Sequence, residues 1–301
     1  MTSRQRVVLI GGKGQMAMSL ARVLPARGFD VTVLARPEYD LTRPAEITDA
    51  IAAASPSVVI NPAAYTAVDR AEIEPATAFA INRDGAAAIS SAAARAGAAV
   101  IHFSTDYVFD GGKTTPYLET DATAPQGVYG ASKLAGEAAV ALVNPRHVIL
   151  RTAWVCSADG ANFLKTMLRL AAERPELRIV DDQRGSPTFA ADIAEATAVI
   201  AGAIRDTAAG APQFGVFHLA SAGETSWCGF ARAIMAASKD LGGPSVPVKA
   251  ITTADFPTKA HRPAYSKLDT SKLARTYGIA LPEWEAAMHT CLGNILGAPR
   301  K

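Results

Sequence analysis

The sequence has little of what would indicate a secreted, a metal-binding or a nucleic-acid-binding protein. It contains three cysteines in 301 residues. Cys156, Cys228 and Cys291 are odd in number and lack metal-ligand spacing, so we expect reduced thiols and no metal site. Charged residues make up 19% of the chain, the net charge is +2 and no run of lysine or arginine stands out. This pattern argues against a nucleic-acid partner.

Long apolar runs and internal repeats are also missing from the sequence. No uninterrupted hydrophobic stretch has the length of a membrane span, and the first residues do not have a signal-peptide pattern. We therefore expect a soluble, cytoplasmic protein without a membrane partner. The chain is 49% hydrophobic and 301 residues long, which suffices for one large domain or two smaller ones.

A glycine-rich turn follows the first predicted strand. The apolar run 6–10 leads into Gly11, Gly14 and Ala17, spaced G-x-x-G-x-x-A, then a helix and a strand at 30–34. This is the context that a dinucleotide-binding loop requires. Glycines let the backbone approach a pyrophosphate, and free N–H groups at the start of the helix bind it. The predicted cofactor contacts of this turn are Gly11, Gly14, Gln15 and Met16.

The end of the second strand predicts which dinucleotide binds. Ala35 and Arg36 follow it, where NAD-selective sites carry a carboxylate for the ribose 2′-hydroxyl. An arginine there accommodates a 2′-phosphate, so Arg36 favours NADPH, with NADH possible; a solvated surface arginine is the alternative. Asp40 and Leu41 come next, and Asp40 could cap the following helix or hydrogen-bond the adenine.

Two further segments leave alternatives open. Ala63 and Ala64 follow a predicted strand at 58–61, and small residues there would let a planar cofactor lie close. A tight turn fits the same residues. Asn82 is polar on a mostly apolar helix that runs through 76–89, so it is either a packed, hydrogen-bonded side chain or a group that fixes the geometry of the site.

The strongest candidate chemistry lies farther along the chain. Ser104, Thr105 and Asp106 follow a buried strand at 99–103, at the edge where open parallel sheets bind ligands. Tyr129 and Lys133 are four residues apart, so on a helix they share one face. A nearby ammonium favours the phenolate, and we expect Lys133 to lower the pKa of Tyr129. A phenol tuned in this way can act as a proton donor.

The pattern of elements predicts an α/β fold, a Rossmann-type doubly wound parallel sheet with a smaller α+β substrate-binding domain. We assign residues 1–155 to the dinucleotide-binding domain, and we expect 181–220 to belong to it as well. The rhythm changes from Asn162 onward, with a helix at 163–173, a short strand at 178–180 and two terminal helices. Residues 156–301 are predicted to form the smaller region, interleaved with the first.

Over nearly the whole chain these segments resemble the extended short-chain dehydrogenase/reductase family, in particular its nucleotide-sugar reductases. The motifs that carry the resemblance are Asp40-Leu41-Thr42, 63–69, 104–109, 129–133, 151–154, 182–188 and Arg262-Pro263. The resemblance implies a catalytic trio of Thr105, Tyr129 and Lys133. It adds cofactor contacts at Asp40, Leu41, Ala63, Ala64, Tyr65, Ser104, Tyr129 and Lys133. The substrate contacts that it implies are Thr66, Val68, Thr105, Asp106, Tyr129, Trp154, Asn162, Phe163 and Arg262.

The activity that the resemblance implies is NADPH-dependent reduction of the C4 ketone of a dTDP-linked 4-keto-6-deoxy sugar, a precursor of cell-surface polysaccharide. Tyr129 would protonate the oxygen, Lys133 would bind the nicotinamide ribose, and Thr105 would polarise the ketone. Ala17, where the family has glycine, and Cys156, where it usually has an aromatic residue, are departures from the pattern. Another nucleotide 4-keto-6-deoxy sugar is an alternative substrate.

Two other functions fit parts of the same resemblance. Related dehydratases place an Asp-Glu pair after the strand-end threonine, but here Tyr107 follows Asp106, which favours simple reduction. A relative that serves as a non-catalytic regulatory subunit would be expected to lack the tyrosine or the lysine, and both are present. Some relatives form a magnesium-bridged dimer through glutamates. The matching positions here are Ser19 and Ala191, so we expect a monomer or weak homodimer without a bound metal.

Overall fold

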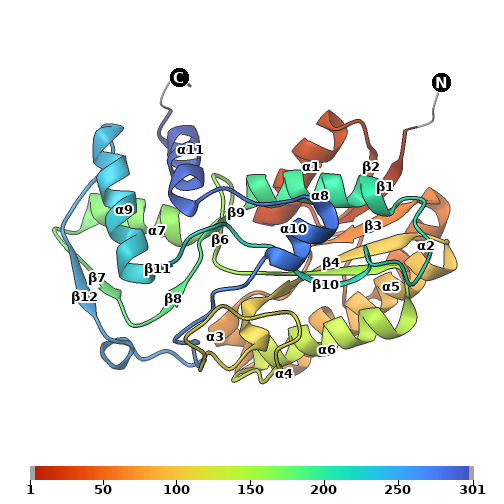
Figure 1. Cartoon of the computed structure of the whole chain (residues 1–301), viewed down its shortest axis with the longest axis horizontal. Helices are drawn as coiled ribbons and strands as arrows, with labels where there is room; N and C mark the ends of the chain where they lie inside the picture. The colour runs from red at the N-terminus through yellow and green to blue at the C-terminus, as the bar shows by residue number, and fades with distance from the viewer. Residues whose placement is uncertain (1–3, 298–301) are drawn as a thin grey trace.

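The computed structural model describes residues 4–297, and a central sheet of six parallel strands organises it (Figure 1). The strand order is β10-β5-β4-β3-β1-β2, so β2 lies on one side of β1 and the later strands follow on the other side, beginning with β3. The strands are β1 (Arg6–Ile10), β2 (Asp30–Leu34), β3 (Val58–Asn61), β4 (Ala99–Thr105), β5 (His147–Thr152) and β10 (Gly215–His218). The predicted doubly wound Rossmann-type sheet is confirmed.

Helices cover both faces of this sheet, which is why its inner strands are apolar on both sides. One face carries α1 (Gln15–Ala26), α8 (Ala190–Ile204) and α10 (Ser271–Tyr277). The other carries α2 (Pro44–Ala54), α5 (Ala86–Arg95) and α6 (Val128–Val143). Since α10 packs on β10 and α8, the end of the chain contributes to the first core, and the two-domain division stays our interpretation.

The long helix predicted through 76–89 is continuous but not regular. It consists of α4 (Pro75–Phe79), η1 (Ala80–Gly85) and α5, and η1 is a π-helical segment. Such wide turns occur mostly as single interruptions of α-helices, frequently at functional sites. Asn82 lies within η1 and is buried, so the irregular turn holds the polar side chain that the sequence left ambiguous.

A second region, at the left of Figure 1, packs around its own core. Its helices are α7 (Phe163–Glu173), α9 (Trp227–Asp240) and α11 (Trp284–Leu296). Its strands form three two-stranded sheets: β7 (Leu177–Val180) with β12 (Val248–Ile251), β6 (Val155–Cys156) with β9 (Thr188–Phe189), and β8 (Arg184–Gly185) with β11 (Thr225–Ser226). Short turns complete the fold: α3 (Val68–Ala71), η2 (Asp106–Val108) and η3 (Thr253–Asp255).

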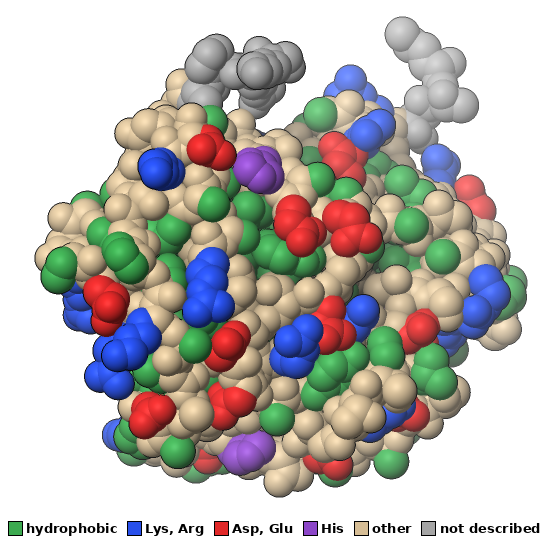
Figure 2. All heavy atoms as spheres, turned by 60° about the vertical axis from the view of Figure 1, so that its left-hand side comes forward, with side chains coloured by type: hydrophobic (Ala, Val, Ile, Leu, Met, Phe, Trp, Pro, Cys, Tyr) green, Lys and Arg blue, Asp and Glu red, His purple; other side chains and the backbone are tan. Residues whose placement is uncertain are grey.

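The surface adds two observations. Within residues 4–297, no helix is both long enough and apolar enough to span a bilayer. On the face shown in Figure 2, acidic and basic side chains are interspersed.

Candidate active site

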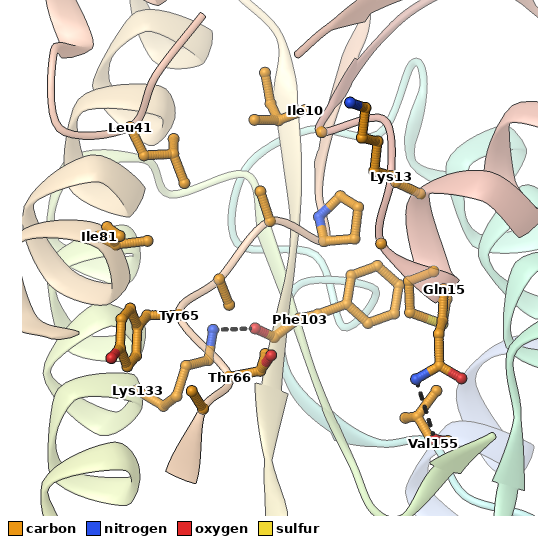
Figure 3. Close-up of a pocket in the computed structure, with 18 of the residues that line it drawn as sticks. Ile10, Lys13, Gln15, Leu41, Tyr65, Thr66, Ile81, Phe103, Lys133 and Val155 are labelled. Carbon is orange, nitrogen blue, oxygen red and sulfur yellow. Dashed lines mark hydrogen bonds between the residues drawn. The ribbon is translucent and has the colours of Figure 1, made fainter. Parts of the chain in front are cut away.

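A cleft of about 1250 Å³ opens at the carboxyl ends of the central strands (Figure 3). Pockets for one drug-sized ligand typically measure about 300–1,000 Å³, so this one has room for a cofactor and a substrate together. The predicted cofactor contacts that line it are Gly11, Gly14, Gln15, Met16, Arg36, Asp40, Leu41, Ala63, Ala64, Tyr65 and Ser104. The predicted substrate and catalytic residues that line it are Thr66, Val68, Thr105, Asp106, Tyr129, Lys133 and Trp154.

The glycine turn is shaped for close approach to a ligand. Gly11 has a φ of +99°, a conformation that other residues rarely adopt, and a Cβ there would lie 3.4 Å from the Cβ of Ala63. Gly14 precedes α1 in an extended conformation and has no side chain that could cap its first N–H groups. Those groups and the helix dipole therefore fit a pyrophosphate.

Asn82 fixes the loop that follows β3. Its Oδ1 accepts from the Tyr65 backbone N–H at 2.8 Å, and its Nδ2 donates to the Tyr65 carbonyl at 3.1 Å. The same Nδ2 lies 2.9 Å from Ser132 Oγ, which in turn donates to the Tyr129 carbonyl at 2.8 Å. Of the two roles left open for Asn82, the structure therefore supports both: it is packed, and it ties the loop at the cofactor side of the cleft to the helix that carries Tyr129.

Asp40 does not cap the next helix. Its Oδ1 accepts from the Thr42 backbone N–H at 2.9 Å and from Thr42 Oγ1 at 2.8 Å, which closes a local turn. Arg43 occupies the cap position of α2. The carboxylate is thus held at the wall of the cleft, and the capping alternative is wrong. Arg36 is exposed at the rim of the same part of the cleft.

Thr105 and Asp106 form a buried pair at the end of β4. Thr105 Oγ1 donates to Asp106 Oδ1 at 2.9 Å and accepts from the Tyr107 backbone N–H at 3.2 Å. Burial raises the pKa of Asp106 to about 6. Among the described residues Asp106 Oδ2 has no hydrogen-bond partner, so a buried acceptor remains available at the wall of the cleft.

Tyr129 and Lys133 lie on α6 as predicted, but the expected lowering of the pKa of Tyr129 is wrong for this structure. Burial raises that pKa, and a hydrogen bond with the Thr105 side chain only partly offsets the effect. Lys133 Nζ donates to the Phe103 carbonyl at 2.6 Å (Figure 3). Burial lowers the pKa of Lys133 to about 8. The phenol is desolvated, and the lysine already has a backbone partner.

Three predicted substrate residues lie beside the cleft rather than in its wall. Asn162 caps α7 and donates from Nδ2 to Gln15 Oε1 at 2.9 Å. Phe163 packs on Trp227, with ring centroids 4.6 Å apart. Arg262 is bound by Asp69 at 2.8 Å and donates to the Tyr107 hydroxyl at 3.3 Å.

Comparison with known proteins places the chain in a family. Residues 5–296 match the family described as RmlD substrate binding domain. The chain belongs to this family. It is 48% identical over 292 residues to the dTDP-4-dehydrorhamnose reductase of Sinorhizobium fredii, covering 97% of this chain and 98% of that relative. It is 46% identical over 297 residues to the protein of the same name from Burkholderia thailandensis, covering 97% and 99%.

A solved structure agrees with these relatives. The dTDP-4-dehydrorhamnose reductase of Bacillus anthracis, in complex with NADP, superposes with a TM-score of 0.89 at 33% identity, covering 97% of this chain and all of that one (100%). The resemblance to the extended short-chain dehydrogenases and reductases, stated from the motifs alone, is confirmed. Membership in the RmlD family covers both the sheet and the second region, since the match runs through α11.

Other groups near the site of this RmlD family member were not predicted from the sequence. Tyr107 packs edge-on against Tyr129 with centroids 5.5 Å apart. Arg151 and Glu137 form a buried ion pair, with Arg151 Nη2 at 2.7 Å from Glu137 Oε2, and Ser104 Oγ donates to Glu137. One signal was available: Glu137 comes four residues after Lys133, on the same face of α6.

The three cysteines are free and buried, which agrees with the expected reduced thiols. Burial raises the pKa of the Cys156 thiol to about 12 and that of Cys291 to about 11. We therefore expect single Cys→Ala variants to keep turnover, with stability losses on the order of 1 kcal/mol, and thiol reagents to label the native protein far more slowly than the unfolded one. Complete loss of turnover in a folded Cys156→Ala protein would show that the site depends on this thiol.

Proposed function

We propose that this protein reduces the C4 ketone of dTDP-4-dehydro-L-rhamnose to dTDP-L-rhamnose with NADPH, a step in the supply of activated rhamnose for cell-surface polysaccharide. The observation that carries the proposal is the convergence of Thr105, Tyr129 and Lys133 on one cleft with the glycine turn. The names of the relatives support the substrate, and the bound NADP of one of them supports the cofactor.

The residues of the cleft fit a nicotinamide dinucleotide. A Cβ at Gly11 would fill the turn against Ala63, and the start of α1 offers free N–H groups for phosphates. Arg36 and Lys133 both line this cleft, where Arg36 would hold a 2′-phosphate and Lys133 the nicotinamide ribose. When bound, NADPH supplies the hydride that adds to C4 of the sugar.

The protein side chains handle the proton and the orientation. Because burial raises the pKa of the Tyr129 phenol, this side chain carries its proton before the reaction. It gives that proton to the oxygen at C4. Thr105 orients the same oxygen; its hydroxyl proton points to Asp106 in this structure and must turn away to donate to the ketone. Asp106 Oδ2 accepts a hydrogen bond from a sugar hydroxyl.

The test is a turnover assay with purified protein, dTDP-4-dehydro-L-rhamnose and each nicotinamide cofactor. NADPH should be consumed, and dTDP-L-rhamnose should form in equal amount. Matched assays with other nucleotide-linked 4-keto-6-deoxy sugars establish the selectivity. Cofactor binding without turnover of any such sugar would instead fit a regulatory nucleotide-binding subunit, and the proposal would be withdrawn.

Cofactor selectivity gives a separate prediction. Arg36→Ala should raise KM for NADPH by about tenfold and leave KM for NADH nearly unchanged, because a charge-assisted hydrogen bond at an exposed site contributes on the order of 1.5 kcal/mol. Arg95→Ala, which removes an exposed arginine on α5, is the matched control and should change neither. Equal kinetics with the two cofactors in the parent protein would refute the assignment of Arg36.

A further inference from the structure

A chain of three buried polar side chains lies behind the cleft. Lys133 Nζ is 3.3 Å from His102 Nε2, and His102 Nδ1 is 3.2 Å from Asn61 Nδ2. Lys133, His102 and Asn61 are 2%, 1% and 1% exposed. In the described part of the chain, the wall of the cleft includes Lys133 but neither of the other two. The lysine is therefore the end of a polar chain that runs into the protein interior.

The fold brings these residues together from three elements. Asn61 ends β3 and is the register partner of His102 on β4. His102 alternates with Ile101 and Phe103, so it points to the sheet face that α6 covers. Gly136 allows the close packing of α6, because a Cβ there would lie 2.1 Å from the Asn82 carbonyl oxygen.

A count of hydrogen atoms shows that the three contacts are coupled. Asn61 Oδ1 already accepts from the Ala63 backbone N–H at 3.2 Å, so the amide presents its NH₂ group to the imidazole. His102 Nδ1 must then accept, and the single proton of the neutral ring lies on Nε2, facing Lys133. A neutral amine has a lone pair for that N–H. An ammonium has only donors, so it requires the other tautomer, with the proton on Nδ1 facing Asn61.

We propose that His102 is a positioning residue for Lys133: its tautomer changes with the charge of the lysine, and Asn61 favours the neutral amine. When Lys133 is charged, the Nδ1–H of His102 faces the NH₂ group of Asn61, so two donors meet. Turning the Asn61 amide over removes this conflict but breaks its hydrogen bond with the Ala63 N–H. Since Ala63 lines the cofactor part of the cleft, the charge of the lysine is linked to the shape of that loop.

The surroundings of Lys133 affect its pKa in opposite directions. Glu137, one turn later on α6, favours the ammonium, whereas burial favours the amine. Arg151 on β5 is paired to that glutamate. Asp106 on η2 and Tyr129 on α6 also line the cleft, while Arg83 and Asp84 on η1 and Arg95 on α5 are exposed. His102 stays neutral, because burial and the charge of Lys133 hold its pKa well below the usual range.

The first test measures the tautomer of His102 in the protein without cofactor, so its result does not depend on the proposed function. Only the role of Lys133 toward the nicotinamide ribose rests on that function. Nitrogen-15 NMR of histidine-labelled protein distinguishes the two tautomers, and a His102→Gln variant identifies the signal among the five histidines. We expect a change from the Nδ1–H to the Nε2–H form centred near pH 8, where Lys133 titrates. One unchanged tautomer between about pH 6 and pH 10, or protonation of the ring to imidazolium in that range, would overturn the proposal.

The second test replaces Asn61 so that the charged form of Lys133 is favoured over the neutral amine. In Asn61→Asp the carboxylate can accept from both Ala63 N–H and Nδ1–H, so Nε2 becomes an acceptor and the ammonium is favoured. The midpoint should rise by about one pH unit, a tenfold change in proton affinity. The basic limb of the pH profile of NADPH affinity should move with it.

Controls separate this coupling from simple charge attraction. Asn144→Asp places a carboxylate at another buried asparagine, at the far end of α6, and should leave the midpoint unchanged. In the double variant Asn61→Asp/His102→Phe, the pH profile of NADPH affinity should lose most of its shift. A full shift without the imidazole would show that the charge alone acts, and the role of His102 would be refuted.

Discussion

Replacing Tyr129 by phenylalanine is expected to lower kcat by about 10²–10⁴-fold, the usual contribution of general acid catalysis. The change removes one hydroxyl and keeps the ring that packs against Tyr107, so the fold and the cofactor site should be preserved. NADPH affinity should therefore stay within about twofold of the parental value, and the loss should lie in the chemical step. Stopped-flow reduction and fluorescence titration of NADPH measure the two quantities separately.

Related variants test whether the loss of kcat comes from the missing Tyr129 proton or from a general disturbance of the cleft. Tyr107→Phe removes a hydroxyl that contacts Arg262 at 3.3 Å in the same cleft, and it should cost less than about tenfold. Lys133→Ala should weaken NADPH binding as well as kcat, and Thr105→Val should cost less than Tyr129→Phe. Parental turnover by Tyr129→Phe would refute the assignment of the proton donor.

The largest expected loss of stability follows from Glu137→Ala. Arg151 donates to both carboxylate oxygens, from Nε at 2.9 Å and from Nη2 at 2.7 Å, and both side chains are 5% exposed. Removing the carboxylate leaves a guanidinium buried without its partner, which typically costs about 3–5 kcal/mol. We expect the free energy of unfolding to fall by that amount in chemical denaturation.

Two comparisons define this prediction. Glu137→Leu combined with Arg151→Met replaces the pair by apolar side chains. This double variant should recover most of the lost stability, because no charged group is then buried without a partner. Arg169→Ala breaks an ion pair whose side chains are 60% and 52% exposed, and it should cost no more than about 1 kcal/mol. A similar small loss from Glu137→Ala would mean that water reaches Arg151.

The elements that the sequence predicted are those with local causes. The apolar run at 99–103 and the glycine turn at Gly11 are determined by residues close in the sequence. The start of α1 lies where expected, and β4 begins where expected but continues two residues farther, through Thr105. The spacing of Tyr129 and Lys133 likewise predicted one helix face. The pKa values of Tyr129 and Lys133 were not predictable in this way, since burial shifts both, and that burial exists only once the cleft has formed.

Features that depend on distant contacts escaped the sequence. The π segment at Asn82 exists where that side chain reaches Tyr65 and Ser132 on other elements. Arg262 and Asp69 are 193 positions apart in the sequence, so no local pattern could show that this arginine is already paired. The same holds for the chain from Asn61 to Lys133, which requires β3, β4 and α6 to be in place.

The most direct measurement of the central claim follows a labelled hydride. Protein is supplied with dTDP-4-dehydro-L-rhamnose and NADPH that carries deuterium at the reactive C4 position of the nicotinamide, and the product is examined by NMR. The account predicts dTDP-L-rhamnose with one deuterium at C4 of the sugar and none elsewhere. Product without deuterium at C4, or consumption of the sugar without oxidation of NADPH, would contradict it.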